Sequence, residues 1–532
     1  MNNAQILDAQ KSFDQKLGTF IWPYSYGLTD SQKTHELLDK SFARMAELGL
    51  NYCVLGMTYA NLSRDGLNNY HASTEPINQY AIESALRNDV IPIVSYGMWA
   101  MTDFDQDIFN HDQQTFLNAI AEIHCRLIRR YKGRQVLWEG LNEPDNGATP
   151  WFDNEGAIDP TRVRQIVQLN TRMAKQVKQD PAMMYFGGNL FTYPAASSDG
   201  VDYWQPYFDD GMLVDSDAFA NHPYGNKYYW QGKPEFVFDK WNPATYAPIK
   251  GMPYVSTEYG YTRDEFDDTT VANYITRQSV LLDAMGYSLF TVYGFDMSGA
   301  SPWSMVNADG SYNQTSTQLL NLRDKLTGYH FDHWISDKIG GLWAARYLGP
   351  NSDEKVVYWV QDSELDATIT FLNGQSLSVH ATNTAKITAS QPVQDVLDGD
   401  FLAKTRANVI GTQETLASMQ RLIMSRMNDS NVPVPDTIKI RPNGDRGTYR
   451  WLVTLPQQIE SNVNAMIDWF NTKQLPWYHM PENQPMQHIQ LRAVHSLWLG
   501  NRVKQIWSQN WLIVHDTLHQ MQDILKQRKL VD

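Results

Sequence analysis

The first 335 residues alternate short apolar runs with amphipathic stretches in which apolar residues recur at helical spacing, such as Lys40–Leu48 and Phe116–Leu127. This alternation is typical of βα units that build a parallel sheet. The apolar runs that we predict to be strands are Thr19–Trp22, Tyr52–Leu55, Ile91–Val94, Val136–Glu139, Met184–Gly187, Ala218–Ala220, Tyr254–Thr257 and Ser288–Val292. Eight strands in about 300 residues predict an α/β fold, the (β/α)₈ or TIM barrel.

The pattern changes after residue 335. Lys355–Val360, Ala367–Phe371 and Ser376–Val379 alternate with period two, and Asn373-Gly374 is a turn signal between the last two. These strands are too few for an independent sandwich, so we expect them to pack on the barrel. Helical spacing then returns in stretches near 409–423, 459–470 and 491–525. The predicted organisation is a barrel at 1–335, a small antiparallel β element at 336–401 and a mainly helical module at 402–532.

The charge distribution supports a separate C-terminal module. The whole chain carries a net charge of −15, with −20 in residues 1–400 and +5 in residues 401–532. An acidic balance argues against a general nucleic-acid-binding protein and against a basic membrane-surface protein. The two cysteines, Cys53 and Cys125, are too few for a disulfide framework or a Cys-rich zinc site. We therefore expect both to be buried free thiols.

The N-terminal residues have neither the basic region nor the apolar region of a signal peptide. No apolar run approaches the ~20 residues that a membrane helix needs. The expected location is the cytoplasm, or outside the cell if a leader has been removed. The 17 Trp and 28 Tyr are a heavy aromatic load, and sugar-binding clefts are one reason for such a load.

The strongest chemical signal is the segment Trp138-Glu-Gly-Leu-Asn-Glu-Pro-Asp145. Asn142 and Glu143 follow the fourth predicted strand, and Glu258 ends the seventh. Barrel enzymes place their catalytic groups at these carboxyl ends of the strands. Two carboxylates at one barrel mouth suit cleavage of a glycosidic bond, in which one carboxylic acid protonates the leaving oxygen and a second carboxylate attacks the sugar or activates water.

Asn142-Glu143-Pro144 after the fourth strand, with a strand-ending Glu258 about 115 residues later, resembles clan A of the glycoside hydrolases. Ala220-Asn-His-Pro-Tyr224 is a third match, and the whole pattern is most similar to family 39-like and family 5-like members. The resemblance covers roughly residues 16–335. It implies that Glu143 is the acid/base, that Glu258 is the nucleophile, and that Asn142 binds the sugar 2-hydroxyl. It also implies that Tyr224 or His222 positions the nucleophile.

These roles make opposite demands on the two carboxyl groups. Before attack, Glu143 must be protonated near neutral pH, so we expect burial and the charge of Glu258 to raise its pKa. Glu258 must be ionised, which requires donors such as Tyr224. Once Glu258 has formed the glycosyl-enzyme, its charge is gone and Glu143 can act as the base that activates water.

Several aromatic residues are candidates for stacking on sugar rings. A large aromatic side chain is about as often part of a core as of a binding site. Clan members often stack the sugar on an aromatic after the eighth strand, where Tyr293 here replaces the usual Trp. Residues of interest in predicted loops also include Trp204 and Trp230, and the preferred candidates after strands and on long loops are Trp22, Trp99, Trp151 and Trp303.

The sequence thus predicts a retaining β-glycosidase, an O-glycosyl hydrolase that acts on an oligo- or polysaccharide. The alternatives are a non-catalytic carbohydrate-binding or scaffold protein that retains the barrel, and a transglycosylase that uses the same two Glu. The C-terminal helical module is a candidate surface for a protein partner. His515 and His519 have the i, i+4 spacing of a metal pair, but no third ligand is evident, so we expect no metal site and no cofactor.

Overall fold

A computed structural model of the chain describes most of the sequence. The described residues are 2–26, 30–64, 69–97, 112–146, 158–191, 202–224, 233–241, 243–298, 301–335, 341–350, 353–372, 376–389, 399–427, 434, 446–472, 488–491 and 500–527. Residue contacts divide the chain into two compact units. The first comprises 1–351, 355–365 and 380–388, and the second comprises 352–354, 366–379 and 389–532.

Eight parallel strands close into a barrel in the first unit, in the order β1-β10-β9-β8-β7-β6-β5-β2. This confirms the predicted (β/α)₈ fold. The barrel strands are β1 (Leu17–Ile21), β2 (Tyr52–Thr58), β5 (Ile91–Gly97), β6 (Leu137–Leu141), β7 (Met184–Leu190), β8 (Ala218–Asn221), β9 (Tyr254–Tyr259) and β10 (Phe290–Val292). Phe20, Val54, Ile93, Leu137 and Val255 are among the buried side chains of one cluster contributed by these strands.

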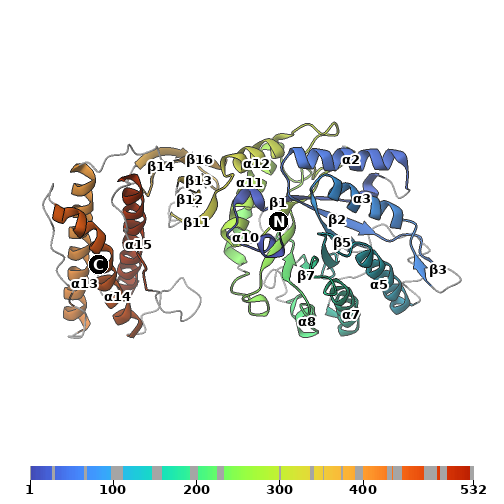
Figure 1. Cartoon of the computed structure of the whole chain (residues 1–532), viewed down its shortest axis with the longest axis horizontal. Coiled ribbons are helices and arrows are strands. Elements are labelled where there is room, and N and C mark those ends of the chain that lie inside the picture. The colour runs from blue at the N-terminus through green and yellow to red at the C-terminus, as the bar shows by residue number, and fades with distance from the viewer. Residues whose placement is uncertain are drawn as a thin grey trace. The chain divides into compact units, whose positions relative to one another are not determined.

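Helices surround the strands (Figure 1). Many begin with a side chain that accepts a hydrogen bond from the first turn, as Asp112, Asp267 and Asn313 do. The helices of this unit are α1 (Asn3–Ile6), α2 (Gln32–Glu47), α3 (Glu75–Arg87), α5 (Gln113–Arg130), α7 (Pro160–Val177), α8 (Gln205–Asp209), α10 (Pro234–Lys240), α11 (Asp268–Ala284) and α12 (Gln314–Lys325). Short elements between them are η1 (Phe13–Gln15), η2 (Pro23–Tyr26), η3 (Ala247–Ile249), β3 (Ser63–Arg64) and β4 (Tyr70–His71).

A four-stranded sheet packs on this barrel. Its order is β11 (His330–Trp334), β12 (Leu342–Leu348), β13 (Glu354–Val360) and β16 (Lys386–Ala389). The buried Trp359 Nε1 donates to Glu235 of α10 at 2.7 Å, and the same Glu235 pairs with the buried Arg277 of α11. The predicted strand at 355–360 is therefore part of a larger sheet, which the period-two pattern did not delimit. The turn expected at Asn373-Gly374 lies outside the described residues.

β14 (Leu365–Thr370) pairs with β15 (Ser376–Ala381) in a two-stranded sheet, most of which belongs to the second unit. The second unit also contains three long helices, α13 (Gly399–Met427), α14 (Arg446–Thr472) and α15 (Gly500–Gln527), which lie side by side (Figure 1). These helices match the three helical stretches expected from the sequence. In the described part of the chain, no helix combines the length and the apolarity needed to cross a bilayer. The boundaries at 335 and 401 stay predictions.

Candidate active site

The barrel brings the two predicted carboxylates to one end. Asn142 and Glu143 follow β6, His222 and Tyr224 follow β8, and Glu258 is the penultimate residue of β9. Because all eight strands are parallel, their carboxyl ends form a single mouth, and β6 and β9 are separated in it only by β7 and β8. The residues that the sequence separates by 115 positions therefore become neighbours.

The imidazole of His222 lies between the two carboxylates. Its Nδ1 is 2.6 Å from Glu143 Oε1 and 3.6 Å from Glu258 Oε2. One atom from each of the three side chains lies within 4.8 Å of the others. Tyr224 donates its hydroxyl to Glu258 Oε2 at 2.8 Å, whereas Oε1 of Glu258 is buried without a hydrogen-bond partner. Tyr224 thus forms a hydrogen bond with Glu258, whereas the hydrogen bond of His222 Nδ1 is with Glu143.

The backbone at Glu143 is held in an unusual conformation. Its φ of 46° lies in the left-handed region, which few non-glycine residues adopt. The Glu143 amide donates to the Asn189 carbonyl at 2.9 Å, and the Asn146 amide donates to the Glu143 carbonyl at 3.0 Å. The Asn146 side chain also donates to Glu143 Oε2 at 2.8 Å. These contacts direct the carboxylate into the mouth rather than along the strand.

Burial and mutual charge set the electrostatics of the site. Burial raises the pKa of Glu258 to about 8, and the charge of Glu143 adds to this effect, although His222 and the Tyr224 hydroxyl oppose it. Burial disfavours the imidazolium, but the carboxylates of Glu258 and Glu143 overcome it and raise the pKa of His222 to about 9. Burial thus favours the protonated form of Glu258, and the neighbouring carboxylates favour the imidazolium form of His222.

Glu139 carries a third carboxylate. It lies in β6, within the Trp138–Asp145 segment. It is fully buried, and neither of its oxygens has a hydrogen-bond partner. Burial raises its pKa to about 7, although the charge of His222 opposes this effect. Sequence reasoning treated Glu139 only as part of the motif, because nothing in the local pattern distinguishes an inward-facing Glu from an outward-facing one.

The two Glu lie in an aromatic cleft of about 320 Å³. Asn142 reaches the cleft with a buried side-chain oxygen that has no hydrogen-bond partner. The indole Nε1 of Trp22 donates to the Tyr293 hydroxyl at 2.9 Å. The residues that line the cleft are Trp22, Tyr24, Asn142, Glu143, Phe191, Tyr224, Glu258, Tyr293 and Trp303. Of the proposed sugar-stacking residues, Trp22, Tyr293 and Trp303 are therefore brought together with the carboxylates.

Other sequence candidates have different positions. Trp204 is fully buried and donates its Nε1 to Asp145 at 3.1 Å, so it supports the motif from behind rather than facing the cleft. Trp99, Trp151 and Trp230 lie outside the described residues. Sequence reasoning missed Tyr24 and Phe191. Each follows a barrel strand by one to three residues, and this proximity to strand ends was the available signal.

One small residue makes room for the cleft wall. A Cβ atom at Gly56 would lie 2.3 Å from the ring of Trp22, so only glycine permits this packing.

Potential metal ligands occur in two places. Glu143, His222 and Glu258 form a donor set that could hold a metal ion. His515 and His519 are exposed on α15, and within the described ranges no third ligand joins them.

Comparisons with known proteins agree with the fold. No family model matches the sequence, and neither does any curated protein. Among solved structures, a family 39 glycoside hydrolase from the gut symbiont Bacteroides cellulosilyticus is similar, with a TM-score of 0.50, 15% identity, and coverage of 72% of this chain and 82% of that chain. A glucosidase from Croceicoccus marinus has a TM-score of 0.46 and 10% identity over 71% of this chain and 82% of its own.

An endo-1,4-beta-mannanase from Rhizomucor miehei has a TM-score of 0.44 and 15% identity over 59% of this chain and 94% of its own. These neighbours are glycoside hydrolases. At such low identities the likeness to the family 39 enzyme establishes the shared fold, and the chemistry of this chain has to be argued from its own residues.

Proposed function

We propose that this chain is a glycoside hydrolase that cleaves a β-linked oligo- or polysaccharide with retention of configuration at the anomeric carbon. The observation that carries the proposal is the pair Glu143 and Glu258, whose carboxylate oxygens lie within 4.8 Å of each other in an aromatic cleft. Retaining enzymes hold their carboxyl groups about 5–5.5 Å apart, and inverting enzymes about 6.5–9.5 Å apart. The short separation supports the retaining mechanism.

In the first step, Glu143 donates its proton to the glycosidic oxygen as the bond from that oxygen to the anomeric carbon breaks. Glu258 forms a new bond to the same carbon, and the leaving alcohol departs. The Glu258 carboxylate is the attacking group, and its Oε2 accepts the hydrogen bond of the Tyr224 hydroxyl at 2.8 Å. Tyr224 then holds the carboxylate in position.

In the second step, the Glu143 carboxylate takes a proton from water as the water oxygen attacks the anomeric carbon. The bond to Glu258 breaks, and its carboxylate is restored. Two inversions leave the product with the configuration of the substrate. The apolar faces of the sugar rings would stack on cleft aromatics such as Trp22 and Trp303.

The reaction requires Glu258 to be ionised and Glu143 to be protonated, whereas burial raises the pKa of Glu258 in the free site. Glu258 therefore has to give up its proton before it can attack. His222 Nδ1 hydrogen-bonds Glu143 at 2.6 Å and lies 3.6 Å from Glu258, at ion-pair distance. We assign this proton transfer to His222, which can give its Nδ1 proton to Glu143 and take one from Glu258.

The test is hydrolysis of a panel of aryl β-glycosides and β-glycans by the full chain. We expect turnover that is lost in Glu258→Gln and retained in the control Glu47→Gln, whose carboxylate is exposed on α2. NMR of the first-formed sugar should show the β-anomer. Binding without turnover would instead identify a carbohydrate-binding protein, and preferential transfer to added acceptor sugars would identify a transglycosylase.

A further inference from the structure

Trp303 lies in the loop between β10 and α12 and lines the cleft. Its ring meets the rings of Tyr224 and Tyr293 edge-on, with centroid distances of 5.7 Å and 5.5 Å. Its carbonyl accepts a hydrogen bond from the Gly294 amide at 3.3 Å, and the Met305 amide donates to the Gly294 carbonyl at 3.1 Å. A loop tryptophan is a precise platform only if its backbone is held in place.

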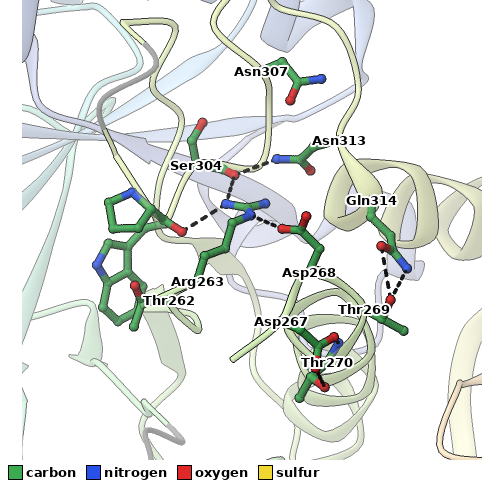
Figure 2. A network of polar contacts seen from close by, with 12 residues as sticks. Thr262, Arg263, Asp267, Asp268, Thr269, Thr270, Ser304, Asn307, Asn313 and Gln314 are labelled. Atoms are coloured by element: carbon green, nitrogen blue, oxygen red, sulfur yellow. Dashed lines mark hydrogen bonds and ion pairs between the residues drawn. The ribbon is translucent and has the colours of Figure 1, made fainter. Parts of the chain in front are cut away.

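Arg263, in the loop after β9, holds this backbone on both sides of Trp303. Its guanidinium Nη1 donates to the carbonyl of Pro302 at 3.0 Å and to that of Ser304 at 2.8 Å. Its own amide donates to the Pro302 carbonyl at 3.2 Å. Asp268, in the first turn of α11, accepts from Arg263 Nε at 2.6 Å and orients the guanidinium (Figure 2).

A second anchor comes from the start of α12. Asn313 caps this helix, because its side-chain oxygen accepts from the Ser316 amide, and its Nδ2 donates to the Ser304 carbonyl at 2.7 Å. The starts of the two helices are joined by Gln314, which donates to Thr269 at 3.0 Å (Figure 2). The carbonyls flanking Trp303 are thus fixed to the N-terminal ends of two successive barrel helices.

We propose that Arg263 is a positioning residue that determines affinity for the glycan by fixing Trp303 as a preformed platform for the apolar face of one sugar ring. This inference rests on the proposed function, and deepens it by naming a residue that acts on the substrate only through another. A preformed platform avoids the entropy loss of ordering a loop when substrate binds, so its effect falls on binding rather than on bond cleavage.

Arg263→Lys is the informative substitution. It keeps the positive charge, but the compact ammonium lacks the planar fork that here bonds two carbonyls and a carboxylate together. We expect KM for a glycan substrate to rise about fivefold or more while kcat changes less than about twofold. The control is Arg87→Lys, which changes an exposed arginine that pairs with Asp39 between α3 and α2 and should alter neither constant.

A double-variant comparison shows whether Arg263 acts through Trp303. Trp303→Ala should raise KM by itself, and Arg263→Lys should add little in that background, because the platform is already absent. Additive effects of the two substitutions would overturn the inference. So would an unchanged KM in Arg263→Lys when the wild type hydrolyses the substrate.

Amide hydrogen exchange provides a readout that needs no turnover. Peptides spanning residues 301–306 should exchange about tenfold faster in Arg263→Lys than in the wild type or in Arg87→Lys. Unchanged exchange would refute the clamp itself. A different result is also possible, in which the wild type hydrolyses no β-glycoside but exchange is still faster in Arg263→Lys. That result would contradict the proposed function and leave the clamp intact. The role of Arg263 in glycan affinity would then be refuted together with the proposed function.

Discussion

The ring nitrogen Nδ1 of His222 lies 2.6 Å from Oε1 of Glu143, and both side chains are almost completely buried at the mouth of the barrel. A cation in this position stabilises the ionised forms of both neighbouring carboxylates. The arrangement explains how two acidic side chains this close together can be held in a dry site. It also makes the protonation of the whole group depend on one imidazole.

Replacing His222 by Gln should shift the pH dependence of catalysis. The charge of His222 lowers the pKa of Glu258, so its removal should raise that pKa further. Since attack needs ionised Glu258, we expect the acidic limb of the kcat/KM profile to move to higher pH by about one unit or more. The control is the kcat/KM profile of His35→Gln, which changes a partly exposed histidine on α2. A limb that stays in place or moves to lower pH would contradict the assignment.

The two carboxylates should differ in their response to the leaving group. An activated aryl glycoside needs no protonation of its leaving oxygen, so Glu143→Gln should still form the glycosyl-enzyme with it. With a poor leaving group, the loss in rate should be about 10²–10⁴-fold. Glu258→Gln should form no covalent intermediate with either substrate. Rapid-quench measurement of the released aglycone distinguishes the two variants, and equal losses on both substrates would refute these roles.

Glu139 should make the stability of the first unit depend on pH. Because burial raises its folded-state pKa to about 7, the folded chain binds more protons than the unfolded chain between the ordinary value of 4.5 and about 7. Its stabilising contribution is present below pH 4.5 and is lost as the pH rises through 7. The loss is about 3 kcal/mol from the size of this shift.

Glu139→Gln removes the titrating group. As the pH rises from 5 to 8, the free energy of unfolding of this variant should therefore decrease less than that of the wild type. Urea unfolding at the two pH values measures the difference. The exposed Glu47→Gln serves as the control. Equal decreases in the wild type and in Glu139→Gln would show that this carboxyl group is not the source.

The buried pair of Arg277 and Glu235 should be essential for the first unit. Both side chains are fully buried, and Glu235 also accepts from Trp359 of the appended sheet. Arg277→Met would leave a buried carboxylate without its cation, at a cost of about 3–5 kcal/mol. Adding Glu235→Leu should recover part of the loss, because the unpaired charge is then absent. Thermal unfolding of both variants tests this, and a neutral Arg277→Met would contradict it.

The barrel followed from the sequence alone, and so did the placement of Glu143 and Glu258 at the same mouth, because the eight apolar runs identify the strands and parallel strands end at one mouth. The sequence did not determine the distance between the two carboxylates, which depends on the closed barrel. Local pattern is enough to predict the strands because strand burial and βα alternation both appear as patterns of apolar and polar residues along the sequence. The extent of the appended sheet was less accessible, because β11, β12, β13 and β16 are joined by pairings between distant segments.

Only the tertiary structure decided which side chains face the cleft. Trp22 and Trp303 line it whereas Trp204 is buried and donates its Nε1 to Asp145, although each of the three comes after a barrel strand along the chain. Beyond the end of a strand, the direction of a side chain depends on the path of the loop backbone, and that path is set by distant partners such as Arg263. Residue type and spacing predicted the chemistry of the mouth, while long-range hydrogen bonds determined its shape.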